Sequence, residues 1–233
     1  MQGGVLNPRP SPYVGTYLLL RVDDPRDGRQ MLRRLADRIA SAATWSARRG
    51  AWLNVALTYR GLEALGVPPE SLATFAPEFR EGMAARAEAL GDVGVNAPEH
   101  WEWPLGTADV HVALAVVATD AERFDALLEE ARAGYGELPG VRVNWRQDCY
   151  ALPTEREAFG FRDGISHPAV EGSGIPGSNP QEPPLKAGEF VTGYADETGD
   201  LAPVPRPEAL GRNGTYVVFR ARRSPTDEER RDE

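Results

Sequence analysis

Hydrophobic and polar positions in the first part of the chain follow two different periods. The run VGTYLLLRV, at residues 14–22, is β-branched, aliphatic and aromatic, and it is bounded by Pro12 and by Asp23-Asp24-Pro25. This pattern predicts a buried strand. Similar short apolar runs predict three more strands, at residues 52–57, 109–119 and 140–147.

Between these runs, apolar residues recur at helical spacing and predict two amphipathic helices that lie on a sheet. The second helix is expected to begin at Thr119-Asp120-Ala121-Glu122, which fits a capping box. The apolar positions are Met31, Leu32, Leu35, Ile39, Ala42 and Ala43 in the first helix, and Phe124, Leu127, Leu128 and Ala131 in the second.

A brief helix and then an insertion, at residues 67–107, make up the rest of this region. A brief helix is expected at residues 58–65, stopped by Gly66 and Pro68, and residues 67–107 are irregular apart from a helical stretch around 77–90. The order strand, helix, strand, insertion, strand, helix, strand predicts an α+β fold. It is a ferredoxin-like βαββαβ domain with an antiparallel sheet, spanning residues 1–150.

The composition changes after this domain. Residues 151–214 are rich in Gly and Pro and predict a long ordered loop, which in compact proteins tends to serve function or linkage. TYVVFR, at 215–220, predicts a final lone strand, and the polar residues after it cannot pack as a core helix. We expect residues 215–233 to be the first strand of an otherwise absent second domain, followed by a polar tail.

Composition narrows the class of protein. Apolar residues make up 41% of the 233 residues, which is enough for a packed core, and the net charge of −9 disfavours a nucleic-acid partner. No apolar run is long enough to cross a bilayer, and the N-terminal residues lack the features of an export signal, so we expect no membrane association and a cytoplasmic location. Cys149 is the only cysteine, which excludes an internal disulfide and a cysteine-based metal cluster.

The densest unusual stretch is FGFRDGISHP, at residues 159–168. Gly160 and Gly164 flank Asp163, and glycine allows positive φ and the close approach of a carboxylate to a crowded place. By local pattern alone, a turn in which Asp163 caps its own backbone is the favoured interpretation.

With its surroundings, this stretch resembles the GxxDG motif of the dye-decolourising (DyP-type) haem peroxidases. PGSNPQEPPLKAGEFVTGY and LGRNGTYVVFR are similar to the segment that follows the motif in that family, and the resemblance covers nearly the whole chain. It implies two ferredoxin-like domains with haem b between them. The second domain would carry the iron ligand and a distal arginine, beyond the residues of this chain.

The resemblance gives the matching residues their roles. Asp163 would be the distal acid–base that moves the peroxide proton from one oxygen to the other, as an ionised carboxylate can. The cofactor-binding residues around it would be Gly160, Phe161, Arg162, Gly164, Ile165, Ser166 and His167.

None of the three histidines occupies a position that matches the family's iron ligand, so we assign no metal ligand. His111 lies within a predicted strand and is expected to be a satisfied structural residue. His167 follows the motif and is more typical of a hydrogen-bonding loop residue, and His100 lies in a loop rich in Pro and Trp.

Three hypotheses follow. In the first, the chain is half of a DyP-type peroxidase and a second polypeptide supplies the haem-ligating half, pairing with the strand at 215–220. In the second, the chain is an inactive binding or assembly module that pairs through the same strand, for example with itself. In the third, it is a shortened peroxidase that binds haem weakly or not at all. The electron donor and the oligomeric state are left open.

Overall fold

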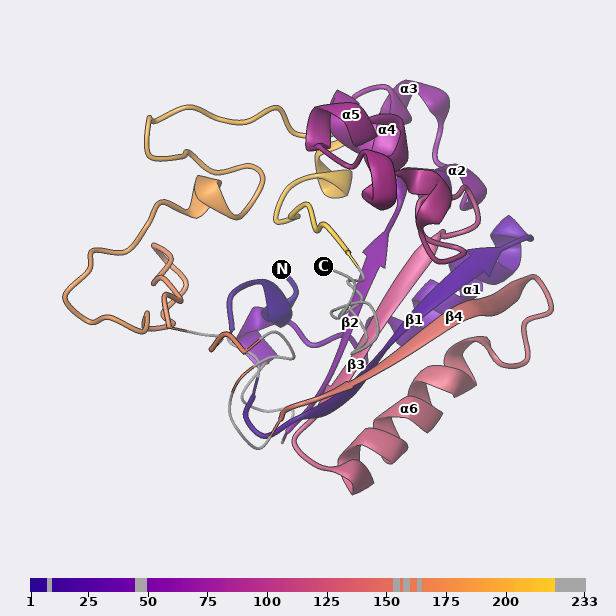
Figure 1. The fold of residues 1–233 in the computed structure, drawn as a ribbon, viewed down its shortest axis with the longest axis horizontal. Helices are drawn as coiled ribbons and strands as arrows, with labels where there is room; N and C mark the ends of the chain where they lie inside the picture. Colours follow the sequence, from indigo (N-terminus) through magenta and orange to yellow (C-terminus); the bar gives the residue numbers. More distant parts are fainter. Residues whose placement is uncertain (8–9, 45–49, 153–155, 157–159, 163–164, 221–233) are drawn as a thin grey trace.

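The chain folds around one antiparallel sheet, seen in a computed structural model that describes residues 1–7, 10–44, 50–152, 156, 160–162 and 165–220. Its strands are β1 (Val14–Val22), β2 (Ala51–Leu57), β3 (Val112–Ala118) and β4 (Val141–Tyr150). Their order in space is β2-β3-β1-β4 (Figure 1), and every neighbouring pair is antiparallel. The predicted α+β, ferredoxin-like fold is confirmed.

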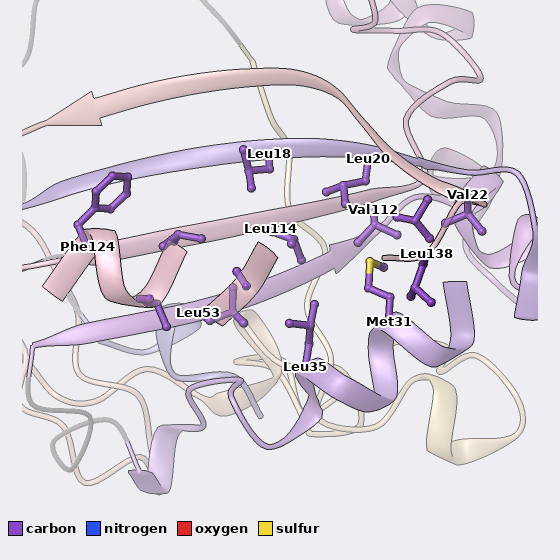
Figure 2. Close-up of a cluster of buried hydrophobic side chains, with 14 of the residues drawn as sticks. Leu18, Leu20, Val22, Met31, Leu35, Leu53, Val112, Leu114, Phe124 and Leu138 are labelled. Atoms are coloured by element: carbon purple, nitrogen blue, oxygen red, sulfur yellow. The ribbon is translucent and has the colours of Figure 1, made fainter. Parts of the chain in front are cut away.

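Two helices, α1 (Pro25–Ala36) and α6 (Ala121–Tyr135), bury their apolar sides against one face of the sheet. Alternation turns every second residue of β1 and β3 toward them, so side chains from strands and helices interlock in a single core (Figure 2). The fully or nearly fully buried members include Leu18, Leu20, Val22, Met31, Leu35, Leu53, Val112, Leu114 and Val116.

Helix α1 ends earlier than the sequence predicts. It begins where the Asp24 carboxylate accepts a hydrogen bond from the Arg26 N–H, and it ends at Ala36 instead of near residue 43. Beyond it, Ile39 forms a bridge with Leu53, and the Ala40 N–H donates to the Leu53 carbonyl at 2.9 Å. Pairing with the sheet edge has replaced the last helical turn.

The capping box predicted for α6 is wrong by one residue. The N-cap is Asp120 and not Thr119, and its carboxylate accepts a hydrogen bond from the Arg123 N–H at 3.0 Å. Because Asp120 supplies the cap, the two side-chain-to-backbone hydrogen bonds of a box between Thr119 and Glu122 are not needed.

The insertion contains α2 (Tyr59–Ala64), α3 (Pro69–Leu72), α4 (Pro77–Ala85) and α5 (Ala87–Leu90). The single helical stretch predicted around 77–90 is broken, because Gly82 has φ 78° and ψ 171° and Arg86 lies between two helices. Residues Leu62, Leu72 and Phe75 form a small second core here.

The predicted strand at 215–220 is not formed, and these residues belong to no helix, strand or turn. A strand is defined by hydrogen bonds to a neighbouring strand, and no described segment pairs with this one.

In the part of the chain that the structure describes, no helix is long and apolar enough to cross a membrane. The domain boundaries drawn from the sequence stay predictions.

Candidate functional site

The motif loop follows β4, and the structure describes part of it. Asp163 and Gly164 lie outside the described residues. Gly160 has φ 91°, a conformation that favours glycine, and among the described residues no atom beyond its chain neighbours lies within 4 Å of the place where a Cβ would be. Arg156 donates to the Gly160 carbonyl at 2.7 Å and forms an isolated bridge with Arg162, so the chain turns back on itself here.

The described part of the loop presents apolar side chains outward. Phe161 is 74% exposed and Ile165 is 66% exposed, and Arg162 and Ser166 are also at the surface. Two large apolar side chains on one exposed loop are typical of a surface that another group covers.

His167 fastens the end of this loop to the N-terminal segment. Its Nε2 donates to the carbonyl of Leu6 at 3.0 Å, and Leu6 is itself buried. Its own carbonyl accepts the Ser178 N–H at 2.7 Å. His167 is therefore the hydrogen-bonding loop residue that the sequence favoured.

His111 is a structural residue, as predicted. The Val22 N–H donates to its Nδ1 at 3.0 Å, and in that tautomer its Nε2 donates to the Ala108 carbonyl at 3.0 Å. Both ring nitrogens are engaged. The third histidine, His100, is exposed at the end of a 3-10 turn in the insertion.

A charged network lies beside His111. Arg21 donates to Asp23 at 2.7 Å and contacts Asp109 as well. The hydrogen bond from Arg21 lowers the pKa of the Asp23 carboxyl, and Asp23 also lies 3.4 Å from the Arg142 guanidinium. This network fixes the end of β1 against the residues that lead into β3.

Opposite the helices, the other face of the sheet carries aromatic residues that residues 215–220 partly cover. Phe219 lies edge-on to Tyr17 of β1, with ring centroids 5.3 Å apart, and edge-on to Trp145 of β4, 5.9 Å apart. The ring of Tyr216 packs on Phe79 of α4, with ring centroids 5.4 Å apart. In Figure 1 this stretch, drawn in yellow, comes down from the insertion in front of the sheet.

Arg220 anchors the same segment. Its guanidinium donates twice to the Asp92 carboxylate, both distances being 2.6 Å, and the Asp92 side chain is only 8% exposed. No sequence signal predicts this pair, because local periodicity cannot relate residues 128 positions apart. By contrast, Val217 and Val218 are 69% and 68% exposed.

A hollow of about 760 Å³ opens beside the point where His167 meets Leu6. Leu6 and Val170 supply apolar wall, and Lys186 and Glu171 form an ion pair of 2.8 Å at its side. The hydrogen bond to Glu171 raises the pKa of Lys186. Among the described residues, no group of three or more His, Cys, Asp or Glu side chains is placed to hold a metal ion.

Comparison with known proteins gives consistent matches over the chain. Residues 1–138 match the family model of the DyP dimeric alpha+beta barrel domain. Peroxidase 2 of Mycetinis scorodonius is 28% identical over 173 residues, and the dye-decolorizing peroxidase of Mycena epipterygia is 29% identical over 174 residues. Each alignment covers 72% of this chain, and the chain spans 31% and 30% of these relatives.

Solved structures agree in fold. An ancestral D-type dye decolorizing peroxidase is 27% identical with a TM-score of 0.74, and the match covers 91% of this chain and 46% of that one. The peroxidase from Auricularia auricula-judae, 20% identical, superposes with a TM-score of 0.70 over 87% of this chain and 44% of its own. The chain belongs to the DyP-type peroxidase superfamily and corresponds to its N-terminal half.

Proposed function

We propose that this chain supplies the distal side of a DyP-type haem peroxidase site, with Asp163 as its acid–base, and that a second polypeptide supplies the haem-ligating half. The observation that carries the proposal is the GxxDG sequence in a chain of this superfamily. The apolar Phe161 and Ile165, exposed on the same loop, support a site that is completed by another group.

The described residues fit haem in part. Exposed apolar side chains on the motif loop suit contact with a flat apolar macrocycle. Two of the three histidines already have ring hydrogen bonds, because His111 uses both ring nitrogens on the backbone and His167 uses Nε2 on Leu6, and His100 is exposed on the insertion. This supports a ligand that comes from the second polypeptide.

When bound, haem b would supply the iron that takes up the peroxide. This chain would contribute the group that transfers the proton between the two peroxide oxygens. The Asp163 carboxylate accepts the proton from one peroxide oxygen and returns it to the other, so that the O–O bond breaks heterolytically. His167 would keep the loop in register with the N-terminal segment, and Gly160 provides the turn before the acid.

The second polypeptide would dock on residues 215–220. Their side chains are fixed at Phe219 and Arg220, while no described strand pairs with their backbone. An extended segment with unpaired N–H and C=O groups is a template for a strand of another chain. Val217 and Val218 would then be buried by that partner.

The experiment is reconstitution. Hemin is titrated into the purified full chain, alone and co-expressed with the product of an adjacent reading frame, and the Soret band and peroxide-dependent dye oxidation are measured. We expect both signals only from the pair. Asp163→Asn should keep the Soret band and slow dye oxidation about a hundredfold or more. Asp125→Asn, at an exposed position of α6, is the matched control.

The outcomes separate the alternatives. An intense Soret complex with dye oxidation from this chain alone would contradict the need for a partner. Full activity of Asp163→Asn would contradict the acid–base role and favour an assembly module. Val218→Pro should abolish co-purification of the pair, whereas Val218→Ala, which keeps the backbone N–H, should not.

A further inference from the structure

The two outer edges of the sheet differ. At β2, the Gln2 side chain acts like a neighbouring strand, because its carbonyl accepts the Val55 N–H at 2.7 Å and its amide donates to the Val55 carbonyl at 2.6 Å. Ala40 covers the same edge at Leu53. At the other edge, β4 pairs only with β1 among the residues that the structure describes.

The register of β4 shows which backbone groups point outward. Ala151 donates its N–H to the Tyr13 carbonyl at 2.9 Å, and the Gln147 carbonyl accepts from Thr16 Oγ1 at 3.2 Å. Odd-numbered residues of this stretch therefore turn their backbone groups to β1. Strand alternation turns the N–H and C=O groups of Arg146 and Asp148 outward.

These two residues also carry charge at the surface. Arg146 Nε donates to Asp148 Oδ1 at 2.7 Å, with 48% and 60% of the two side chains exposed. The hydrogen bond from Arg146 lowers the pKa of the Asp148 carboxyl, which favours the charged form of that carboxyl. Next to them, Tyr150 is 66% exposed.

We propose that two copies of this chain pair antiparallel through β4, with the twofold axis at Gln147. In this register Arg146 lies opposite Asp148 of the second copy, and Asp148 lies opposite its Arg146. The four side chains alternate in sign around a square, which adds two cross-strand ion pairs to the one that exists within each strand. The backbone groups of the same residues complete the ladder: the Asp148 carbonyl, which accepts from Gln147 Nε2 at 2.8 Å in the single chain, accepts the Arg146 N–H of the second copy instead.

Other registers are less favourable. An axis at Arg146 or at Asp148 would place like charges directly opposite each other, which destabilises a strand pair. If the pairing of the two β4 strands shifted by one residue, residues whose backbone groups point away from β1 would lie opposite residues whose backbone groups point toward it. The bulge between Leu19 and Leu20 ends the regular pairing of β4 before Trp145, so the regular stretch from Trp145 to Tyr150 is almost centred on Gln147. A second copy is thus the partner that this edge fits.

The test measures self-association of the full chain by sedimentation equilibrium. Wild type should dimerise. Asp148→Arg and Arg146→Asp should each weaken the dimer about tenfold, because two attractive pairs become repulsive. An equimolar mixture of these two variants should associate again, and the double variant, in which the charges are exchanged, should dimerise like wild type. Arg33→Asp, an equal charge change on the exposed side of α1, should have no effect.

Amide hydrogen exchange locates the interface. The N–H groups of Arg146 and Asp148 should exchange more slowly as the protein concentration rises. A wild-type chain that stays monomeric, a dimer that Asp148→Arg leaves unchanged, or a dimer that only Val218→Pro disrupts would each overturn the proposal. The last result would place self-association at residues 215–220 instead.

Discussion

Among the glycines that the structure describes, Gly61 in α2 leaves the least room for a side chain. A Cβ built there would lie 1.9 Å from the carbonyl oxygen of His111 and 2.7 Å from its carbonyl carbon. Non-bonded heavy atoms normally lie about 3.5–4.0 Å apart. Because the obstacle is backbone, Gly61→Ala must push α2 away from β3.

The loss can be estimated from the contacts that hold α2 in place. The Thr58 N–H donates to the His111 carbonyl at 3.1 Å, and Thr58 Oγ1 donates to the Val110 carbonyl at 2.6 Å. Each hydrogen bond contributes about 1 kcal/mol, and Leu62, now 6% exposed, would lose part of its burial. Alanine recovers about 1 kcal/mol of helix propensity. We expect a net loss of about 2 kcal/mol in the free energy of unfolding.

Urea unfolding followed by circular dichroism measures this change. The comparison variant is Gly134→Ala in α6, where a Cβ would meet Leu35 Cδ2 at 2.6 Å. There the obstacle is a side chain, which can shift, so the loss should be smaller than at Gly61. If Gly61→Ala is as stable as wild type or more stable, α2 moves freely and the reasoning about the backbone contact is refuted.

Three further predictions concern other contacts. Leu35→Ala should cost less in the Gly134→Ala background than in wild type, because the new methyl group fills part of the cavity; additive losses in urea unfolding would contradict this. Arg220→Gln should change Trp145 fluorescence, because it frees the segment that holds Phe219 against Trp145, whereas Arg86→Gln, which removes an exposed ion pair, should not. For acid stability, the Arg123 backbone N–H lowers the pKa of Asp120, so its stabilisation is complete above the unfolded pKa of about 3.9 and is lost as the pH falls through the lower folded value. In Asp120→Asn, the urea concentration at the unfolding midpoint should therefore depend less on pH in the acid range. An unchanged pH dependence would refute the claim that the ionised Asp120 carboxylate stabilises the start of α6.

The sheet and its two covering helices could be predicted from sequence because their signals are local. The strand at residues 14–22 has the predicted bounds, since nothing competes with a run whose alternate residues are all buried. The predicted helix that should have reached residue 43 failed because the Ala40 N–H donates to the carbonyl of Leu53, which lies on another element and forms a bridge with Ile39. Periodicity along one segment contains no information about such a partner.

The candidate site divides in the same way. The GxxDG sequence identifies Asp163 as a candidate by resemblance, although Asp163 itself lies outside the described residues. The contacts that hold the surrounding loops join distant parts of the chain, as in Leu6 with His167, Thr74 with Arg206, and Asp92 with Arg220. Two of these three are single hydrogen bonds between a side chain and a backbone group, and such contacts leave no periodic pattern in the sequence.

Residues 215–220 show why a correct pattern can predict an element that is not formed. A strand with the apolar sequence TYVVFR is stable when both of its faces are buried and its backbone groups have hydrogen-bonding partners. In the described chain, the side chains of Tyr216, Phe219 and Arg220 contact other residues, whereas Val217 and Val218 stay exposed. Since side-chain anchoring already restricts this segment, a pairing strand would have less conformational entropy to overcome than on a free peptide. The difference between the predicted strand and the observed segment is therefore the feature that most favours a docking partner.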